Sequence, residues 1–377
     1  MLYWLFYERL FPYFSPFRVF SYVTFRTAAA SLLALFLSIV LGPWFIRRLR
    51  EFQIAQHIRE EGPPSHKNKA GTPTMGGVLI VVSIVLPTLL LANLQNQYVW
   101  IALFGLVCYA AIGFWDDVSK IRQRRNLGLT GRRKFALQCL VAFLIGVALL
   151  VLHARGGYST AINVPFVKDF KPELLIRPWL DNPVTYPLAF VFFFTFLILV
   201  IVGSSNAVNL TDGLDGLAIG LMIIAAAAMT VLTYVSGHAV FANYLGLARL
   251  PGAAELSIFC GAMMGASIGF LYYNAHPAEV FMGDVGSLAL GGGLGVVAVL
   301  IKQEILLLAV GGVYVVEALS VILQVGSFKL RGKRIFKMAP LHHHFEALGW
   351  PESKIIVRFW IAGLVMALFA LTTLKLR

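Results

Sequence analysis

Long apolar stretches alternate with short polar segments along the entire chain. Each stretch holds about 20 residues, the length that a helix needs to cross the hydrocarbon core of a bilayer. Ten such stretches predict membrane-spanning helices, with bounds near 24–46, 75–94, 98–115, 134–153, 187–206, 217–235, 256–274, 286–301, 305–326 and 355–375. We therefore expect an all-α polytopic integral membrane protein, folded as a single transmembrane helical bundle over residues 1–377.

Basic residues fall in alternate connections between these stretches. The first, third and ninth connections are rich in Lys and Arg, whereas the second, near residues 93–98, has no charge. Basic loops of membrane proteins face the cytoplasm. An even number of spans then places both termini on the periplasmic side. The expected cytoplasmic loops, which hold every polar motif, lie near 47–74, 116–134, 206–216, 274–287 and 328–354.

The first 20 residues differ from a signal peptide. They include the aromatic residues Trp4, Tyr7, Phe11 and Tyr13, and they lack a basic start and a small-residue cleavage site. Aromatic side chains concentrate at the headgroup level of membranes. We expect residues 1–20 to form an interfacial segment.

The composition excludes a soluble globular protein. Charged residues make up only 13% of the chain and hydrophobic residues 59%, whereas soluble proteins are about a quarter charged. The formal net charge of +13 comes from the basic loops, so it suits anionic headgroups and anionic substrates rather than nucleic acid. Cys108, Cys139 and Cys260 lie within apolar stretches and suggest no disulfide framework.

Carboxylates stand at two span ends on the predicted cytoplasmic face. Asp116 and Asp117 follow directly on an apolar run, and Asp284 precedes the eighth span. Such groups are costly at a membrane boundary unless they meet water, a cation or a partner. One interpretation is structural: a solvated helix end neutralised by Lys120, and a helix N-cap at Asp284. The other is a site for a hard cation such as Mg²⁺ or for proton transfer.

A second motif runs from Asn209 to Gly216. Asp212 and Asp215 are three residues apart and would share one face of a helix. Gly213 allows a ligand to approach the backbone closely. A capped helix start is the alternative interpretation.

Histidines 342–344 are consecutive. Three adjacent residues of a helix cannot all face one ion, so a zinc triad is poor geometry. Binding of phosphate or sugar by one or two of these side chains is the better interpretation, and a polar loop is the alternative. The segment 67–77 joins lysines, threonines and glycines ahead of a span, which suits phosphate binding, although it lacks the Walker spacing.

Glu317 lies inside the ninth predicted span. A carboxylate within the membrane is a functional hypothesis by default. It could line a polar groove or pair with a neighbour such as Gln324 or Arg26, and no chemical step is assigned to it.

Carboxylates, histidines and lysines thus gather on one membrane face. With Mg²⁺ to neutralise a diphosphate, they form the usual set for phosphoryl transfer. A site at the membrane boundary implies one soluble and one lipid substrate.

The motifs also resemble those of a known family, the polyprenyl-phosphate N-acetylhexosamine-1-phosphate transferases, over essentially the whole chain. They stand in family order as Thr72-Pro73-Thr74-Met75-Gly76-Gly77, Asp116-Asp117, Asn209-Leu210-Thr211-Asp212-Gly213-Leu214-Asp215-Gly216, Phe281-Met282-Gly283-Asp284 and His342-His343-His344-Phe345-Glu346. The histidine run followed by Phe345-Glu346 and Gly349-Trp350 is similar to the phospho-N-acetylmuramoyl-pentapeptide transferase branch.

The resemblance implies a reaction and a place for it. UDP-MurNAc-pentapeptide and undecaprenyl phosphate would give lipid I and UMP with Mg²⁺, the first membrane step of peptidoglycan synthesis. The protein would lie among membrane lipids in the bacterial cytoplasmic (inner) membrane, as a homodimer. A groove beside the ninth span, with Glu317 near it, would pass the prenyl chain.

The resemblance also implies roles for individual residues. Asp284 would be the chief Mg²⁺ ligand, helped by Asp116 and Asp117, and these three with His343 would be the catalytic residues. Phe281 would stack on uracil. The remaining substrate contacts would come from Lys69, Thr74, Lys120, Asn209, Asp212, Gly213, Leu214, Asp215, Asn274, His342 and His344.

Two other functions stay open at this point. A polyprenyl-phosphate GlcNAc-1-phosphate transferase would share most motifs, although the His-His-His-Phe-Glu run argues against it. A lipid or nucleotide-sugar transporter would place polar groups near the bilayer midplane, often in repeated halves. Here the polar groups cluster at one face and only Glu317 favours a transport path.

Overall fold

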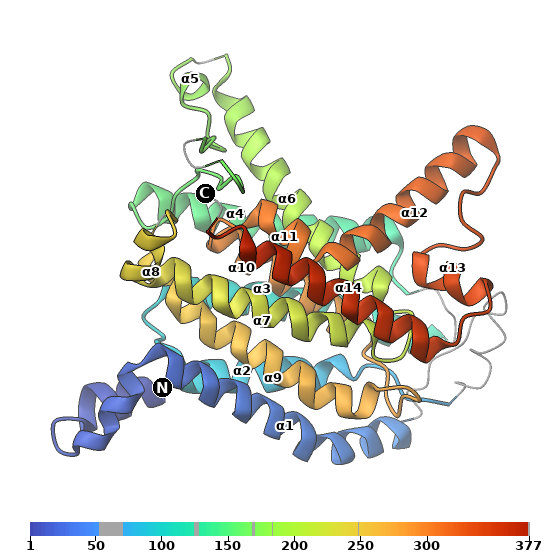
Figure 1. The fold of residues 1–377 in the computed structure, drawn as a ribbon, viewed down its shortest axis with the longest axis horizontal. Coiled ribbons are helices and arrows are strands. Elements are labelled where there is room, and N and C mark those ends of the chain that lie inside the picture. Colours follow the sequence, from blue (N-terminus) through green and yellow to red (C-terminus); the bar gives the residue numbers. More distant parts are fainter. Residues whose placement is uncertain (53–70, 124–127, 168–169, 183, 248, 376–377) are drawn as a thin grey trace.

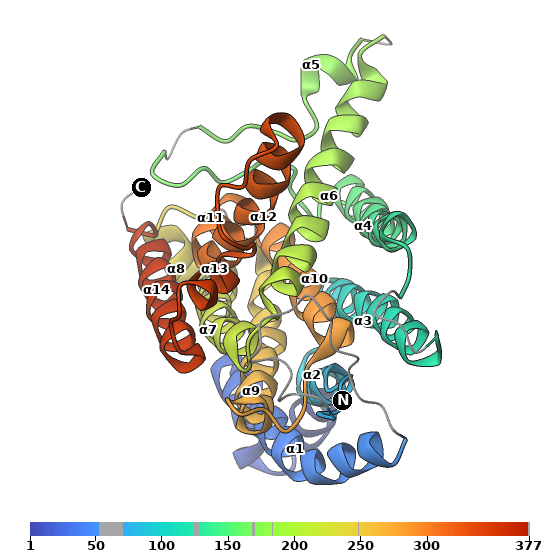
Figure 2. The same ribbon diagram turned by 90° about the vertical axis from the view of Figure 1, so that its right-hand side faces the viewer.

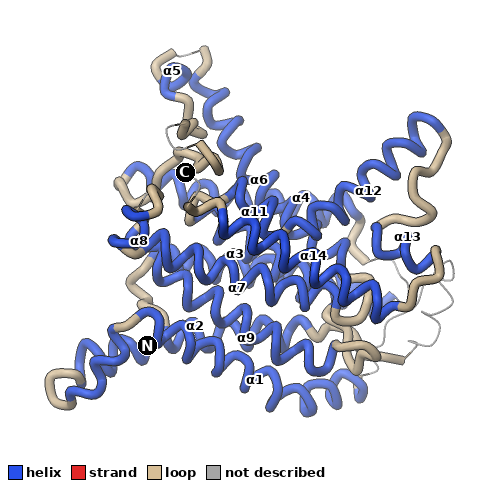
Figure 3. The backbone as a smooth tube through the Cα atoms, viewed as in Figure 1, coloured by secondary structure: helices blue, strands red, loops and turns tan. Residues whose placement is uncertain are grey.

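The computed structural model describes residues 1–377 except 53–70, 124–127, 168–169, 183, 248 and 376–377. Within these described ranges every regular element is a helix and no strand is formed (Figure 3). The all-α prediction is confirmed.

The described helices match the apolar stretches closely. Nine of them are long and apolar enough to cross a membrane. The long helices are α1 (Val23–Glu51), α3 (Gln97–Gln123), α4 (Gly131–Ala154), α6 (Tyr186–Thr211), α7 (Leu217–Gly237), α9 (Leu256–Asn274), α10 (Gly283–Leu300), α12 (Gly312–Arg331) and α14 (Glu352–Thr372). Shorter helices are α2 (Gly77–Leu91), α5 (Arg177–Leu180), α8 (Ala239–Tyr244), α11 (Glu304–Val310) and α13 (Leu341–Ala347). The π-helix η1 (Tyr3–Leu10) and the 3-10 helices η2 (Ser15–Ser21) and η4 (Pro251–Glu255) are also short. The chain is therefore a multi-pass membrane protein, with α2 in place of the second predicted span.

The ninth predicted span differs from the structure. One continuous helix over 305–326 was expected, but α11 ends at Val310 and α12 begins at Gly312. The pair Gly311-Gly312 at the break has no side chains to hold a helical conformation, and glycine weakens a helix by about 1 kcal/mol relative to alanine. The break lets α12 leave the bundle at an angle, toward the upper right of Figure 1. The prediction of an unbroken helix there is wrong.

Helix α10 is the centre of the bundle. It packs between α3 and α6 (Figure 2) and is buried along almost its whole length. Small residues make this possible: a methyl group at Gly292 would lie 2.6 Å from the Tyr109 ring, and one at Gly77 would collide with the backbone of Gly286. Close approach of backbones at glycines is the usual way in which membrane helices pack.

The two ends of the bundle differ. Helix α13 lies at one end, whereas α1 begins and α14 ends at the other (Figure 1). The end where α1 begins carries two buried ion pairs, Arg26–Glu255 at 2.7 Å and Lys302–Glu304 at 2.8 Å. Neither pair was predicted. The short helices η1 and η2, within residues 1–21, lie at the same end as these ion pairs. Their position at the membrane interface stays a prediction.

Candidate active site

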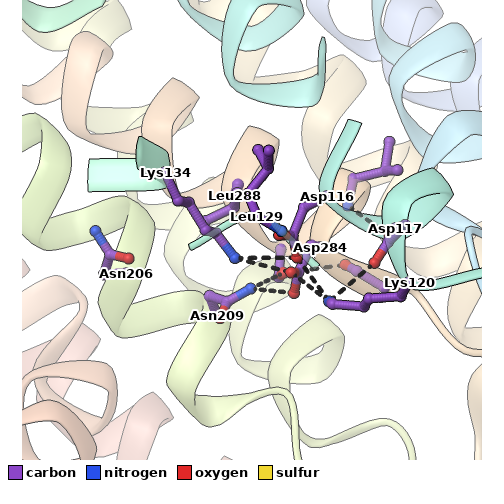
Figure 4. Close-up of polar contacts among 12 residues, drawn as sticks. Asp116, Asp117, Lys120, Leu129, Lys134, Asn206, Asn209, Asp284 and Leu288 are labelled. Atoms are coloured by element: carbon purple, nitrogen blue, oxygen red, sulfur yellow. Dashed lines mark hydrogen bonds and ion pairs between the residues drawn. The ribbon is translucent and has the colours of Figure 1, made fainter. Parts of the chain in front are cut away.

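Three carboxylates and two ammonium groups meet where α3, α4 and α10 end or begin (Figure 4). The Lys120 Nζ lies 2.7 Å from Asp116 Oδ2, 3.2 Å from Asp117 Oδ1 and 2.6 Å from Asp284 Oδ2. The Lys134 Nζ lies 2.8 Å from Asp284 Oδ2 and 3.6 Å from Asp116 Oδ2. The side chains of Asp116 and Asp117 are each 4% exposed. The structure thus brings together the three predicted metal ligands and Lys120.

Each carboxylate is fixed by an uncharged donor on its other oxygen. Leu129 N donates to Asp116 Oδ1 at 2.7 Å, and Val285 N to Asp117 Oδ2 at 3.2 Å. Asn209 Nδ2 donates to Asp284 Oδ1 at 2.7 Å. The three remaining oxygens therefore converge on one point, which the Lys120 ammonium occupies.

Local sequence explains this convergence. Lys120 follows Asp116 and Asp117 by four and three residues, so all three share a face of α3. Gly113 lets the start of α10 approach α3, because a methyl group there would collide with the Asp284 carbonyl. Gly283 has a φ of +71°, and a methyl group there would lie 2.6 Å from Asp117 Oδ2. A side chain at position 283 would be strained and would displace a carboxylate.

The site suits a hard cation. The ligand oxygens of the three aspartates lie within 4.8 Å of one another. Carboxylate oxygens are the ligands that Mg²⁺ prefers, and one or two carboxylates with substrate phosphates are its usual set. The convergence on a positive group is the observation that supports the fit.

The loop after α6 adds two more aspartates. Asp212 ends α6, and burial together with the negative charges of Asp284, Asp117 and Asp215 raises its pKa to about 8. Asp215 Oδ2 accepts a hydrogen bond from Ala278 N at 3.1 Å and lies 3.3 Å from His276 Nδ1.

His276 and Glu352 form a second polar cluster around Asp215. The backbone N of Asp215 donates to Glu352 Oε1 at 3.1 Å, and His276 Nδ1 lies 3.6 Å from Glu352 Oε2. His276 and Glu352 were not predicted to belong to the site, since neither lies in a run of polar residues that signals one.

Asn274 links two loops of the site. Its Oδ1 accepts from Gly216 N at 3.1 Å and its Nδ2 donates to Val280 O at 2.8 Å. Both ends of its amide thus hold backbone, which positions Gly213 and Leu214 on one side and Phe281 on the other.

Phe281 and Thr74 come from segments that pair with each other. Phe281 N donates to Pro73 O at 2.8 Å, and Gly76 N donates to Phe281 O at 2.9 Å. Thr74 is buried near Gly283, whereas Phe281 is half-buried. Lys69 lies outside the described residues.

The three histidines of α13 divide between two surfaces. His342 and His343 turn their Nε2 atoms toward Gly213: a methyl group at Gly213 would collide with the first and lie 3.2 Å from the second. His344 Nδ1 instead accepts a hydrogen bond from Lys337 N at 3.1 Å. The structure therefore places His342 and His343 beside the Asp212–Asp215 loop and His344 away from it.

Glu317 has a partner that the sequence analysis did not foresee. Its carboxylate accepts hydrogen bonds from the start of α13, at Leu341 N and His342 N. Arg26 pairs with Glu255, and Gln324 binds the backbone at Ile335 and Phe336 instead.

Two residues of the carboxylate cluster were also missed. Lys134 stands at the start of a predicted span, where a lysine is an ordinary interfacial anchor. Ser287 Oγ accepts from Asn209 Nδ2 at 2.9 Å. Its place one turn after Asp284 was the available signal, because residues three or four apart share a helix face.

Fold and site together define a class: an integral membrane protein with a centre of carboxylates and lysines at the end of its helical bundle, whose three aspartates could hold a cation. Comparison with known proteins is more specific. Residues 99–302 match the model of glycosyl transferase family 4, and residues 69–81 match phospho-N-acetylmuramoyl-pentapeptide-transferase signature 1. Curated proteins named phospho-N-acetylmuramoyl-pentapeptide-transferase are similar over the full length of both chains: that of Solibacter usitatus is 68% identical, and those of Koribacter versatilis and Acidobacterium capsulatum are 66% identical. The chain belongs to the phospho-N-acetylmuramoyl-pentapeptide-transferase family.

Proposed function

We propose that this protein transfers phospho-MurNAc-pentapeptide from UDP-MurNAc-pentapeptide to undecaprenyl phosphate, giving lipid I and UMP. The observation that carries the proposal is the 68% identity, over the whole of both chains, to a relative with that name. The aspartate and lysine cluster supports it, because positioning and charge stabilisation are the main work of phosphoryl transfer. A transporter would place its polar groups near the midplane, whereas these lie where helices end.

Asp284, Asp116 and Asp117 are proposed to hold Mg²⁺. When bound, the ion would neutralise the diphosphate and act as a Lewis acid on its oxygens. Asn209 fixes Asp284 by its Oδ1, so Oδ2 is the oxygen that would bind a cation. The ammonium groups of Lys120 and Lys134 now lie within 3 Å of that Oδ2. With a cation in their place, both lysines would contact substrate oxygens instead.

The chain's own residues are assigned positioning and electrostatic roles. An oxygen of the lipid phosphate forms a bond to the sugar-linked phosphorus, and the bond from that phosphorus to the bridging oxygen of UMP breaks. The lipid phosphate is already largely ionised at neutral pH, with a second pKa of about 6. Asp116 and Asp117 therefore orient the nucleophile and need not remove a proton from it. His343 would contact the diphosphate or sugar.

The uridine site is proposed to lie between the Asp212–Asp215 loop and Phe281. An aromatic face binds a base with little loss of entropy, and the half-buried Phe281 ring offers one. Asp215 and the backbone at Gly213 and Leu214 would hydrogen-bond the uracil. The ribose, diphosphate or sugar would contact Lys69, Thr74, Lys120, Asn209, Asp212, Asn274 and His342. His344, which accepts a hydrogen bond from Lys337 N, is not part of this proposed site.

The bacterial cytoplasmic membrane and a homodimer are part of the same proposal. Both are carried over from the family resemblance, and helices long enough to cross a bilayer support a position in a membrane. Light scattering of the detergent-solubilised protein measures the mass of the assembly and tests the second.

The deciding experiment is UMP release by the purified protein in detergent. Undecaprenyl phosphate and Mg²⁺ are supplied with either UDP-MurNAc-pentapeptide or UDP-GlcNAc. Release with the first alone, lost on adding EDTA, is the expected result. Release with UDP-GlcNAc would move the protein to the sister transferases, and release with neither, from folded protein, would contradict the proposed activity.

A further inference from the structure

Glu317 is a carboxylate buried within a membrane-spanning helix. It lies in the second turn of α12, and it is 0% exposed. A carboxylate in such a place is strongly destabilising unless its oxygens accept hydrogen bonds or meet a cation. Its contacts therefore show what the residue does.

Both of its oxygens are directed at α13. Leu341 N donates to Oε2 at 2.7 Å and His342 N donates to Oε1 at 3.1 Å. The first N–H groups of a helix have no partner within that helix. Glu317 supplies the missing acceptors from a different helix, and so it fixes where α13 begins.

The same carboxylate faces the ring of His342. His342 Nδ1 lies 3.3 Å from Glu317 Oε2, and both side chains are fully buried. A carboxylate beside Nδ1 favours a proton on that nitrogen, which sets the orientation of the ring and leaves Nε2 for other contacts. That Nε2 atom is the one turned toward Gly213.

His343 follows from the same arrangement. Its ring centroid lies 4.2 Å from that of His342, and its Nδ1 lies 2.6 Å from Glu346 Oε2. Two neighbouring histidines therefore present Nε2 to the Asp212–Asp215 loop, each with a carboxylate behind it. In both cases the position of the ring depends on α13 staying attached to α12.

We propose that Glu317 is the positioning residue of this pair: by holding the start of α13 and the ring of His342, it keeps both Nε2 atoms against the Gly213 loop, beside the proposed site of the nucleotide substrate. The inference rests on the proposed function, because it assigns that substrate to the loop. It gives the intramembrane carboxylate a role in the reaction without contact to any reacting atom.

The test compares Glu317→Gln with a control on the same helix. Ser320→Ala removes a buried hydroxyl group one turn away, whose Oγ donates a hydrogen bond to the carbonyl of Glu317 within α12. We expect Glu317→Gln to lower kcat of UMP release by about 10- to 100-fold, the range seen when a carboxylate behind a functional histidine is lost. The KM for undecaprenyl phosphate is expected to stay the same, Glu317→Asp to regain part of kcat, and Ser320→Ala to behave like the unmodified protein.

Two further readouts separate positioning from general stability. Hydrogen exchange is expected to rise in peptides that cover α13 and to stay unchanged in those that cover α12. Combining Glu317→Gln with His342→Ala is expected to cost more than His342→Ala alone but less than the product of the two single losses, because Glu317 acts partly through His342 and partly through His343.

The outcomes are distinguishable from failure of the proposed function. If the unmodified protein releases no UMP, the function is wrong and α13 protection still reports on the contact. If it releases UMP while Glu317→Gln keeps a normal kcat, or while the double variant shows multiplied losses, the positioning role is overturned. Failure of both Glu317→Gln and Glu317→Asp to fold, with Ser320→Ala folding, would also overturn it, since Glu317 would then support the bundle as a whole.

Discussion

Replacing Lys120 with methionine removes the cation at the centre of the three-aspartate cluster. Its ammonium lies between 2.6 and 3.2 Å from an oxygen of each aspartate. Two unit charges 4 Å apart interact by about 4 kcal/mol at the effective dielectric constant of a protein site. In the variant the carboxylates would face one another with Lys134 as their cation among the described residues.

The loss of stability in Lys120→Met has an upper bound, because one of the three carboxylates can take up a proton. At pH 7.5 the protonation of an aspartate with an ordinary pKa of about 3.9 requires about 5 kcal/mol. Removal of one partner from a buried ion pair costs about 3 to 5 kcal/mol. We therefore expect the free energy of unfolding of metal-free Lys120→Met to fall by about 3 to 5 kcal/mol.

Equilibrium unfolding in mixed detergent, in EDTA and in Mg²⁺, measures this effect. A divalent cation replaces the missing charge, so Mg²⁺ is expected to stabilise Lys120→Met more than the unmodified protein. Lys354→Met, an exposed lysine near Trp350 on α14, serves as the control and should respond like the unmodified protein. An equal response of Lys120→Met and the control to Mg²⁺ would refute the reasoning.

Other changes test the remaining parts of the site. Asp284→Ala should lower the rate of UMP release by about 100-fold or more, because it removes the proposed metal ligand, a carboxylate that Asn209 holds in place; near-normal turnover of the folded variant would refute the metal role. Phe281→Ala should raise KM for the uridine substrate by the factor that corresponds to about 1 to 3 kcal/mol of binding free energy, the contribution of base stacking. KM for the lipid should stay unchanged, so equal effects on both would exclude stacking. Because the pKa of Asp212 is raised to about 8 in the folded protein, the folded state binds the extra proton, and the resulting stability is lost as pH rises toward and through 8. Asp212→Asn should reduce this decline in unfolding curves of metal-free protein between about pH 4 and pH 8, the interval between the ordinary and the raised pKa, and parallel curves would contradict the raised pKa.

Helix positions were predictable because the membrane imposes a length on each apolar stretch. That rule fails at Gly311-Gly312, and a second glycine run shows why the break could not be predicted. Gly291-Gly292-Gly293 stays helical inside α10, where Tyr109, Ser204 and other neighbours pack closely against it. Gly311 and Gly312 are buried as well, and a methyl group at Gly312 would collide with the Met366 side chain. Glycine permits a break in a helix without requiring one, so a glycine run in the sequence does not tell where a helix ends.

In the site, contacts between neighbours in the sequence could be predicted, whereas contacts between distant residues could not. Lys120 reaches Asp116 and Asp117 because they are neighbours on one helix, and such a pair can be inferred from spacing alone. The contact of Lys134 with Asp284 spans 150 residues. It exists because α10 packs against α3 and its first turn thereby comes close to the first turn of α4. Glu317 is a similar case: its partners lie only 24 and 25 residues away, but they meet it because the chain folds back after α12. An isolated carboxylate in a span signals a function to a reader of the sequence, whereas the identity of its partner is a property of the folded bundle.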